Sequence, residues 1–441
     1  MSGVPIVAQV AEIDTGDTAW MLAATALVLL MTPALGLFYA GLVRAKNPLN
    51  TFMMCIAAIA VAVVTWAALG YSFAFSDGND IIGGFDYAFL NDVTFEPREG
   101  STIPHLVFFA FQATFCIITT ALISGAVVER MRFSAFLVFA GLWSVLVYAV
   151  LAHWAFGPGW LLTGGTLDFA GGVAVEMGSG FSALAAALVV GARKDYGRQA
   201  LLPHNAVYVL VGAGLLWFGW FGFNGGSGFN TGQNSVLAFT NTLLCPACCL
   251  LAWFLLDALR GRRVTAVGAA TAIIVGCVGI TPAGGFVSPG YAMLLGVLVA
   301  VPCYAVIAYR TRTRVDETLD VLAAHGVAGF TGILFIGFFA QLSWNGLSDG
   351  LFYGNAEQLW DQAKAALAAP AYAFGATYVL LRVMRALMPL RASEREEALG
   401  LDVVYHGEEA YPTGEGAILV STEAGIEEPV PVAGADVSAK T

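Results

Sequence analysis

Charged side chains are scarce in this sequence. Asp, Glu, Lys and Arg together make up 12% of the 441 residues, whereas a typical soluble domain carries about 25%. Hydrophobic residues make up 58%. So few charges cannot cover the surface of a water-soluble protein of this length. The composition therefore excludes that class and favours a chain embedded in a lipid bilayer.

Signatures of enzymes and of nucleotide-driven pumps are also missing. The sequence contains no G-x-x-x-x-G-K-[ST] phosphate loop, no H-E-x-x-H zinc motif and no G-x-S-x-G nucleophile elbow, the motifs that serve phosphate binding, zinc hydrolysis and serine hydrolysis. The longest polar stretch, 389–441, is too short for an enzyme domain. We expect neither catalytic activity nor a cofactor, and the net charge of -11 implies no nucleic-acid partner.

Potential metal ligands are few and scattered. Seven cysteines lie almost wholly within apolar segments, and a C-x-x-C-C run at 245–249 has no histidine nearby. A metal or redox site there is one interpretation, but packing of small apolar side chains is the one we favour. Four histidines lie at the ends of apolar segments or in the C-terminal region: His105, His153, His204 and His406. No metal site is expected.

Long apolar runs dominate the rest of the sequence. Crossing the ~30 Å hydrocarbon layer as a helix takes about 20 apolar residues, because every backbone polar group must be bonded within the segment. We therefore expect an all-α integral membrane protein with eleven transmembrane helices. The predicted segments are 19–43, 50–75, 104–128, 133–152, 170–192, 205–223, 236–259, 264–280, 290–310, 321–340 and 365–388.

Basic residues predict the orientation of these helices. The first eighteen residues contain no Lys or Arg, so the positive region of a signal peptide is missing and the first helix is expected to be retained. With the N-terminus outside and the C-terminus cytoplasmic, only Arg98 and Lys364 of the twenty Lys and Arg residues fall outside, as the positive-inside rule requires. The predicted parts are an external segment at 1–18, a membrane domain at 19–388 and a cytoplasmic tail at 389–441.

Two segments of the sequence match each other. The fifth predicted helix carries Glu176 four residues before a Gly-Phe-Ser motif at 180–182, and the tenth carries His325 four residues before a Gly-Phe-Thr motif at 329–331. Five helices separate the segments, which gives them opposite directions through the bilayer. Many transporters consist of such inverted repeats, with the site at their interface near the midplane. The match predicts two inverted five-helix repeats plus a C-terminal eleventh helix.

Glu176 and His325 are each the only ionisable side chain in their predicted helix. Ionisable residues at this depth are costly unless paired or hydrated, and they usually line a substrate or proton path. We therefore favour a transport or proton-relay role over a purely structural pair that joins two helices. Asp168 lies just before the fifth helix and is expected to cap it. Attraction of a cation is the alternative role for Asp168.

Aromatic residues gather near the predicted outer ends of several helices. An interfacial belt explains most of them. A few could instead form a cage with Ser227, because a ring face attracts an ammonium ion by about 0.5–2 kcal/mol. The residues are Phe111, Phe115, Trp154, Phe156, Trp220, Phe221 and Phe223. Spacing along the sequence does not select among them.

Eight short motifs resemble those of the ammonium transporters of the Amt/Mep/Rh superfamily. They occur in order and extend over nearly the whole chain, from about residue 20 to residue 411, which makes the resemblance specific. The motifs are Phe-Tyr-Ala-Gly-Leu-Val at 38–43, Phe-Gln-Ala-Thr-Phe at 111–115, Ala-Leu-Ile-Ser-Gly-Ala-Val-Val-Glu-Arg at 121–130, Leu-Asp-Phe-Ala-Gly-Gly at 167–172, Pro-His-Asn at 203–205, Trp-Phe-Gly-Phe-Asn-Gly-Gly-Ser at 220–227, Asp-Val-Leu-Ala-Ala-His-Gly-Val at 320–327 and His-Gly-Glu-Glu-Ala-Tyr at 406–411.

The resemblance implies a homotrimer in the cytoplasmic (inner) cell membrane, with one hydrophobic pore in each subunit. In this family an outer site binds ammonium, two stacked phenylalanines gate the pore, and two histidines line it. By motif, Phe115 and Phe223 match the gate, and His325 matches the second histidine. The outer site and the lining of the pathway are matched by a further set: Asp168, Phe115, Ser227, Phe156, Trp154, Gln112 and Thr281.

Two positions depart from the family's pattern. Glu176 stands where the first pore histidine is expected, and Phe156 stands where the outer site has tryptophan. The neighbouring Trp154 is the alternative aromatic for the outer site. A carboxyl group and an imidazole titrate in different pH ranges, so Glu176 affects chiefly how a proton would travel along the pore.

The sequence therefore predicts a channel or transporter that recruits ammonium, or its analogue methylammonium, removes a proton and passes ammonia through the pore. Ammonium itself would cross an apolar pore at a cost of many kcal/mol, whereas neutral ammonia crosses far more cheaply. A non-conducting or weakly conducting ammonium sensor of the same fold is the alternative. By analogy with the family, a PII-type regulator is an expected partner at the cytoplasmic face.

Overall fold

The computed structural model describes residues 12–411, so most of the predicted external segment and the end of the predicted tail lie outside the described residues. Within them the regular secondary structure is helical apart from three isolated β-bridges, which confirms the all-α prediction. The segments are α1 (Thr15–Leu42), α2 (Pro48–Thr65), η1 (Trp66–Gly70), α3 (Tyr71–Phe75), η2 (Ala88–Leu90), α4 (His105–Val127), α5 (Phe133–Trp143), η3 (Ser144–Tyr148), α6 (Ala149–Ala155), α7 (Trp160–Thr163), η4 (Gly172–Met177), α8 (Gly178–Val190), α9 (Ala206–Gly226), α10 (Gln233–Leu259), α11 (Ala266–Ile280), α12 (Pro289–Arg310), η5 (Leu322–Val327), α13 (Ala328–Phe339), α14 (Leu342–Asn345), η6 (Leu351–Tyr353), α15 (Ala356–Leu387), α16 (Glu394–Leu399) and α17 (Leu401–His406).

Helices suited to cross a bilayer account for most of the described chain. Ten stretches are long and apolar enough to span it, and α11 is a shorter apolar helix of 15 residues. Together they match the eleven predicted segments in order. One clear difference is α15, which begins at Ala356 instead of 365. Sequence analysis missed this start because the first turns are polar: Asn355 caps them, and the buried Gln362 donates a hydrogen bond to the Leu167 carbonyl at 2.7 Å.

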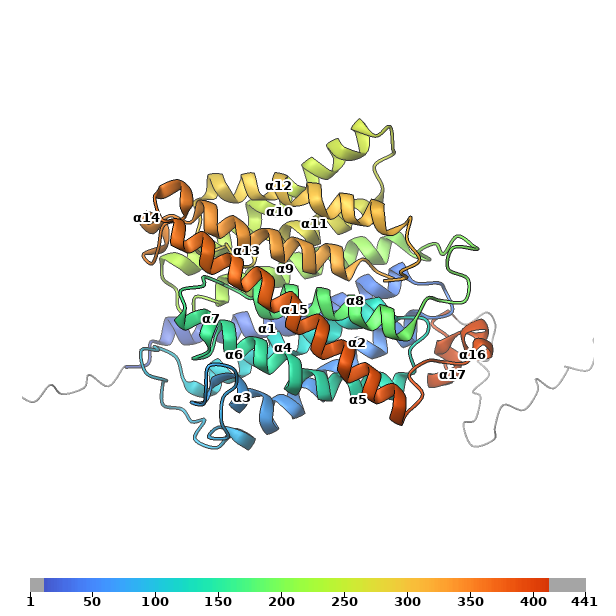
Figure 1. Cartoon of the computed structure of the whole chain (residues 1–441), viewed down its shortest axis with the longest axis horizontal. Coiled ribbons are helices and arrows are strands. Elements are labelled where there is room, and N and C mark those ends of the chain that lie inside the picture. The colour runs from blue at the N-terminus through green and yellow to red at the C-terminus, as the bar shows by residue number, and fades with distance from the viewer. Residues whose placement is uncertain (1–11, 412–441) are drawn as a thin grey trace, which may run out of the picture.

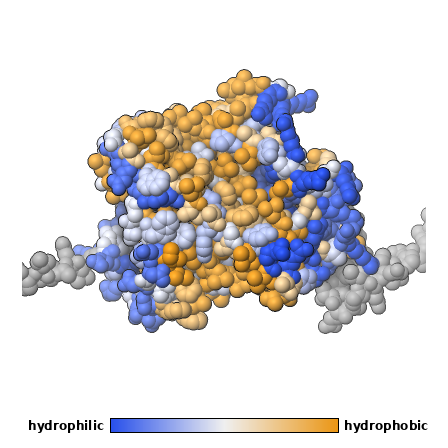
Figure 2. Space-filling model, viewed as in Figure 1, coloured by the Kyte–Doolittle hydropathy of each residue, from blue (hydrophilic) through white to orange (hydrophobic). Residues whose placement is uncertain are grey.

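The long helices lie side by side, and α15 crosses the others obliquely (Figure 1). Figure 2 shows a broad hydrophobic band between hydrophilic ends on the face in view. Large apolar side chains point outward from the helices, including Leu251 and Leu255 of α10 and Val301 of α12. An apolar outer surface of this extent belongs in contact with lipid. The chain is therefore a multi-pass membrane protein.

Two π-helical turns mark the matched halves of the molecule. One of them, η4, contains Glu176 and leads into α8, and the other, η5, contains His325 and leads into α13. The two halves make reciprocal contacts: a Cβ atom on Gly180 would lie 2.2 Å from Gly326 N, and one on Gly329 would lie 2.6 Å from the Glu176 Cβ. Small residues allow helix backbones to approach this closely. The matched segments thus cross at their ionisable residues.

Loops that were predicted to be cytoplasmic meet at one end of the bundle, beside α16 and α17 (Figure 1). Glu129 lies at the centre of this cluster, 3.1 Å from Arg44 and 2.8 Å from Arg193. Burial raises the pKa of Glu129, but Arg193 and Arg44 outweigh burial and lower the pKa below its ordinary value. Buried charges are stable only when they are paired in this way.

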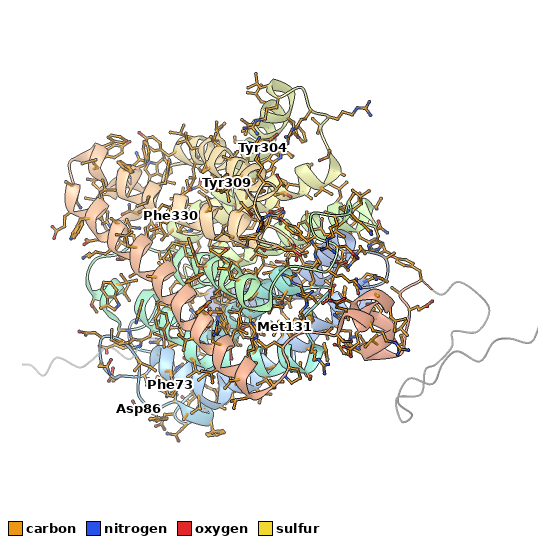
Figure 3. The ribbon with its side chains drawn as sticks, turned by 45° about the vertical axis from the view of Figure 1, so that its right-hand side comes forward. Phe73, Asp86, Met131, Tyr304, Tyr309 and Phe330 are labelled. Atoms are coloured by element: carbon orange, nitrogen blue, oxygen red, sulfur yellow. The ribbon has the colours of Figure 1, made fainter. Side chains whose placement is uncertain are left out.

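The tail is attached to the same end. Asp402 of α17 accepts hydrogen bonds from Leu49 N at 3.1 Å and Asn50 N at 2.7 Å, at the start of α2. Met131 forms a β-bridge with Arg391; Figure 3 shows Met131 beside the tail helices, whereas Asp86 lies toward the opposite end. This grouping of loops agrees with the predicted alternation. Which end faces the cytoplasm stays a prediction.

Candidate functional site

An open cavity lies at the end of the bundle away from the tail. Aromatic rings form much of its wall, among them Phe108, Phe169, Phe229 and Phe286. Four of the predicted site residues also line it: Gln112, Phe156, Asp168 and Ser227. The structure therefore brings together residues from α4, α9 and the segment before η4. We call this space the outer cavity.

Asp168 has a structural role as well as a place in the outer cavity. Its Oδ1 accepts hydrogen bonds from Gly171 N at 2.9 Å and Gly172 N at 2.7 Å, and its Oδ2 accepts one from Val173 N at 2.8 Å. The carboxylate thus caps η4, as predicted. Burial raises the pKa of Asp168 to about 6, although the three N–H donors act in the opposite direction.

Phe156 and Trp154, the alternative aromatics of the outer site, lie in different surroundings. Phe156 lines the outer cavity, whereas Trp154 is not among the lining residues. The indole Nε1 of Trp154 donates to the Ile81 carbonyl at 3.0 Å, and its ring packs against Trp160 and Tyr372 with centroid distances of 5.6 and 4.9 Å. The structure therefore corrects the expectation that Trp154 could replace Phe156 at the cavity.

Two stacked rings separate the outer cavity from the interior. Phe115 of α4 and Phe223 of α9 lie with centroids 4.1 Å apart and planes inclined by 26°, and both are buried. Ring contacts run continuously from the outer cavity to this stack: Phe108 to Phe229 at 5.0 Å, Phe229 to Phe111 at 5.8 Å and Phe111 to Phe115 at 4.8 Å. The stacked rings therefore lie at the inner end of a continuous series of aromatic contacts that begins at the outer cavity.

A small enclosed cavity lies next to the stack and holds the matched pair. It has a volume of about 20 Å³ and is lined by Phe223, Trp220, Glu176, His325 and apolar side chains. That volume accommodates about one water-sized molecule. Glu176 Oε2 lies 2.7 Å from His325 Nδ1, and the other oxygen, Oε1, has no hydrogen-bond partner among the described residues. A buried acceptor without a partner is unfavourable, so Oε1 is suited to receive a small donor.

His325 also lines a cavity on the opposite side, toward the tail end. The walls of this inner vestibule include Phe38, Pro203 and Asp320. Asp320 forms an ion pair with Arg310 at 2.5 Å. The imidazole of His325 therefore lies between the enclosed cavity and the inner vestibule. Sequence analysis did not single out Asp320 or Arg310, because their pairing depends on the path of the loop between α12 and η5.

Glu317 is a further residue that was not singled out from the sequence. Its Oε1 accepts a hydrogen bond from Val321 N at 3.0 Å, and its Oε2 accepts one from Leu322 N at 3.2 Å. Asp168 makes the equivalent bonds ahead of η4, and the two acids are separated by the same 149 residues that separate the matched pair. Applying this spacing to Asp168 would have found Glu317. Burial raises the pKa of Glu317 to about 7.

Two predicted residues form hydrogen bonds with aromatic residues of the path. Thr281 does not line the enclosed cavity, but its Oγ1 accepts a hydrogen bond from Trp220 Nε1 at 2.9 Å. Ser227 Oγ donates to the Phe223 carbonyl at 2.7 Å and so connects the outer cavity to the stacked rings. The cysteines of the 245–249 run have free thiols.

The comparisons with known proteins agree on one family. The sequence model described as Ammonium Transporter Family matches residues 19–411. An ammonium transporter of Bacillus subtilis is 44% identical over 399 residues, which cover 90% of this chain and 98% of the relative. An ammonium transporter of Aquifex aeolicus is 43% identical over 407 residues, which cover 91% of this chain and 94% of the relative.

Solved structures give the same result. The S453D mutant of Mep2 from Candida albicans superposes with a TM-score of 0.83 at 34% identity, over 87% of this chain and 89% of that chain. A sensor Amt protein superposes with a TM-score of 0.82 at 27% identity, over 89% of this chain and 98% of that chain. The eleven-helix arrangement, the stacked rings and these matches lead to one conclusion: the chain belongs to the Ammonium Transporter Family.

Proposed function

We propose that this chain moves ammonium across the cytoplasmic membrane by binding the ion in the outer cavity, removing a proton and passing ammonia inward. One observation carries the proposal: the Phe115–Phe223 stack and the Glu176–His325 pair lie in series between the outer cavity and the inner vestibule. The ammonium transporters of Bacillus subtilis and Aquifex aeolicus, at 44% and 43% identity, support the choice of substrate.

The outer cavity offers ammonium both ring faces and oxygen atoms. Phe156 and Phe108 present aromatic surface, which attracts a cation. Gln112 Oε1 has no hydrogen-bond partner among the described residues, so it is free to accept an N–H of the ion. The carboxylate of Asp168 supplies negative charge. Methylammonium fits the same description, because its methyl group can lie against a ring while its N–H groups reach the oxygens.

Ammonia and the proton take the inner part of the path separately. The apolar walls of the enclosed cavity exclude an ion but admit a neutral molecule of about one water's size. When Glu176 carries its proton on Oε2, a second proton can arrive at Oε1 while the Oε2 proton passes to His325 Nδ1, which is 2.7 Å away. Loss of the proton on Nε2 of His325 then releases it into the inner vestibule.

An ammonium sensor of the same fold is the second candidate. The superposition on a sensor Amt protein supports it, as does the short bond between Glu176 and His325. A sensor would bind ammonium in the outer cavity and report occupancy through the tail end without flux. Binding of ammonium to purified protein in the absence of any current would favour this function.

The proposal extends to assembly and location. The outward apolar side chains of α10 and α12 are suited to contact lipid or neighbouring subunits, and we propose a homotrimer in the cytoplasmic (inner) membrane. The tail, held at one end by Asp402 and Arg391, offers the surface for a PII-type regulator. Cross-linking of the purified protein, and co-elution with such a regulator, test these two statements.

Ammonium-evoked currents in proteoliposomes test the proposed function. We expect the wild-type chain to conduct, and we expect Glu176→Ala and His325→Ala to lower the current by at least about tenfold, because each removes a partner in proton transfer. Glu357→Ala serves as a matched control, since Glu357 is exposed at the start of α15. Unchanged currents in both pore variants would rule out the relay.

A further inference from the structure

Arg98 lies at the outer cavity and is not used by the proposed transport steps. Among the residues that line this cavity, Arg98 and Asp168 are the charged ones. Arg98 also lines a neighbouring surface cavity together with Asp14, Asp17 and Glu99. The entrance to a cation path therefore carries a fixed positive charge, which opposes the charge of Asp168.

The guanidinium group of Arg98 covers aromatic surface. Its Cζ atom lies 4.4 Å from the centroid of Phe108 and 5.4 Å from that of Phe75, the geometry of a cation–π contact. Phe108 is the outermost ring of the series that leads through Phe229 and Phe111 to the gate. Arg98 therefore occupies the kind of surface that would otherwise attract an incoming ammonium ion.

Local backbone structure holds Arg98 in this position. The Arg98 carbonyl accepts a hydrogen bond from Ser101 N at 2.9 Å, and Gly100, at φ 73°, supplies the positive φ that such a turn requires. Pro97 and Pro104 form a β-bridge across the base of the turn. Within residues 12–411, no carboxylate lies within ion-pair distance of Arg98. Its charge is thus fixed in place and uncompensated by a direct partner.

We propose that Arg98 is an affinity-determining residue: a tethered cation that competes with ammonium for the aromatic surface and the field of Asp168 at the outer cavity. The inference rests on the proposed function, because it concerns the same cavity and the same ion. Arg98 weakens ammonium binding in two ways, since it repels the ion and covers the Phe108 ring. It therefore raises the ammonium concentration at which the outer cavity becomes half-occupied.

Removal of the side chain tests the proposal. In proteoliposomes, we expect Arg98→Ala to lower the half-saturating ammonium concentration by about two- to fivefold, the size expected for one like charge and one ring face at a hydrated mouth, with little change in maximal current. Arg98→Lys keeps the charge and should stay close to wild type. Lys364→Gln is the matched control, because Lys364 is the other basic residue predicted at this end and is already paired with Asp361 at 2.8 Å.

Chemical rescue provides a readout that a merely structural role would not affect. Millimolar guanidinium chloride should enter the vacated space over Phe108 and Phe75 in Arg98→Ala and return its half-saturating concentration toward the wild-type value. The same addition should leave the wild-type and Lys364→Gln proteins unchanged. Sodium chloride at equal ionic strength controls for screening.

The outcomes separate this inference from the proposed function. Absence of both ammonium-evoked current and methylammonium uptake in the wild-type protein overturns transport. Calorimetric measurement of ammonium binding then tests the role of Arg98, and we expect tighter binding in Arg98→Ala. Currents or binding with equal half-saturation in wild type and Arg98→Ala overturn the role of Arg98. An Arg98→Lys protein that behaves like Arg98→Ala also overturns the proposal, because the positive charge of residue 98 would then not determine the affinity for ammonium.

Discussion

The two ends of the path, the outer mouth at the outer cavity and the inner mouth at the inner vestibule, have the same backbone arrangement with different side chains. At the outer mouth, Asp168 caps η4 and Gly171 has a φ of 120°. At the inner mouth, Glu317 caps η5 and Asp320 has a φ of 60°. A left-handed conformation is unfavourable for a residue with a side chain, and the ion pair of Asp320 with Arg310 helps to hold it there.

This difference shows which features the repeat preserves. The acid that caps each π-helical turn is retained, because buried backbone N–H groups need an acceptor. The charges around each acid differ. The cap Asp168 has no basic side chain within ion-pair distance in the described part of the chain, although Arg98 lines the same cavity, whereas beside the cap Glu317 the neighbouring Asp320 is paired with Arg310. We therefore expect the carboxylate of Asp168 to be more available to a cation than that of Asp320.

The largest expected effect comes from breaking the contact between the two halves. A Cβ atom on Gly180 would lie 2.2 Å from the backbone N of Gly326, and this backbone cannot move without displacing η5. We expect Gly180→Ala to cost at least about 3 kcal/mol and to leave little folded protein, as measured by fluorescence-detected size-exclusion chromatography. Gly329→Ala should also be costly, because its Cβ would lie 2.6 Å from the Glu176 Cβ, which is bonded directly to the backbone of η4.

Gly214→Ala is the control for both glycine variants, because a Cβ atom on Gly214 of α9 would have no neighbour within 4 Å. Equal yield and equal Tm for Gly180→Ala and Gly214→Ala would contradict the close crossing of the two halves.

A smaller effect should distinguish the two capping acids. Asp168→Ala leaves three N–H groups without their acceptor and Glu317→Ala leaves two, and each unsatisfied group costs about 1–3 kcal/mol. We expect both variants to lower Tm, Asp168→Ala more strongly. Asp168→Ala should in addition weaken ammonium binding in calorimetry, because Asp168 lines the outer cavity.

Asp86→Ala is the matched control for the capping acids, since the Asp86 side chain is exposed at the outer end. If Glu317→Ala weakened ammonium binding as much as Asp168→Ala, the two mouths would not differ in the way the structure indicates.

The smallest expected effect is a difference in pH dependence. Burial raises the pKa of Asp168 from 3.8 to about 6 and that of Glu317 from 4.5 to about 7. The fold favours the protonated form of both acids, so their contribution to stability is complete below the ordinary pKa values and is lost as pH rises through about 6 and about 7. Relative to wild type, Glu317→Gln should flatten the Tm profile near pH 7, and Asp168→Asn should flatten it near pH 6.

Differential scanning fluorimetry between pH 4 and pH 8 would measure these profiles. Parallel profiles for wild type and both variants would show that neither acid titrates in this range.

The membrane architecture could be predicted from the sequence. The eleven segments followed from apolar length alone, because the thickness of the bilayer fixes how long a spanning helix must be. The pairing of Glu176 with His325 followed from the repeat, since equivalent positions in inverted repeats meet at the interface. Cap formation by Asp168 followed from its place directly before the helix.

Other features depended on contacts that a sequence does not display. Trp154 and Phe156 are two residues apart, and the Ile81 carbonyl of a distant loop holds the Trp154 ring away from the cavity. The polar first turns of α15 are helical because they pack against the segment around Leu167. Glu317 was within reach of the sequence, because the 149-residue repeat spacing applied to Asp168 singles it out from its acidic neighbours.

The π-helical turns also decide where the chain could be shortened. A π-helical turn contains one residue more than the α-helical turn that would replace it. Deleting a single residue from η4 would let that turn rewind as α-helix and leave the residues on either side close to their present orientation, whereas deleting one from the regular helix α8 would rotate the residues on its two sides relative to each other by about 100°. A homologue one residue shorter in η4 could therefore keep Asp168 beside the outer cavity, and a homologue one residue shorter in α8 could not.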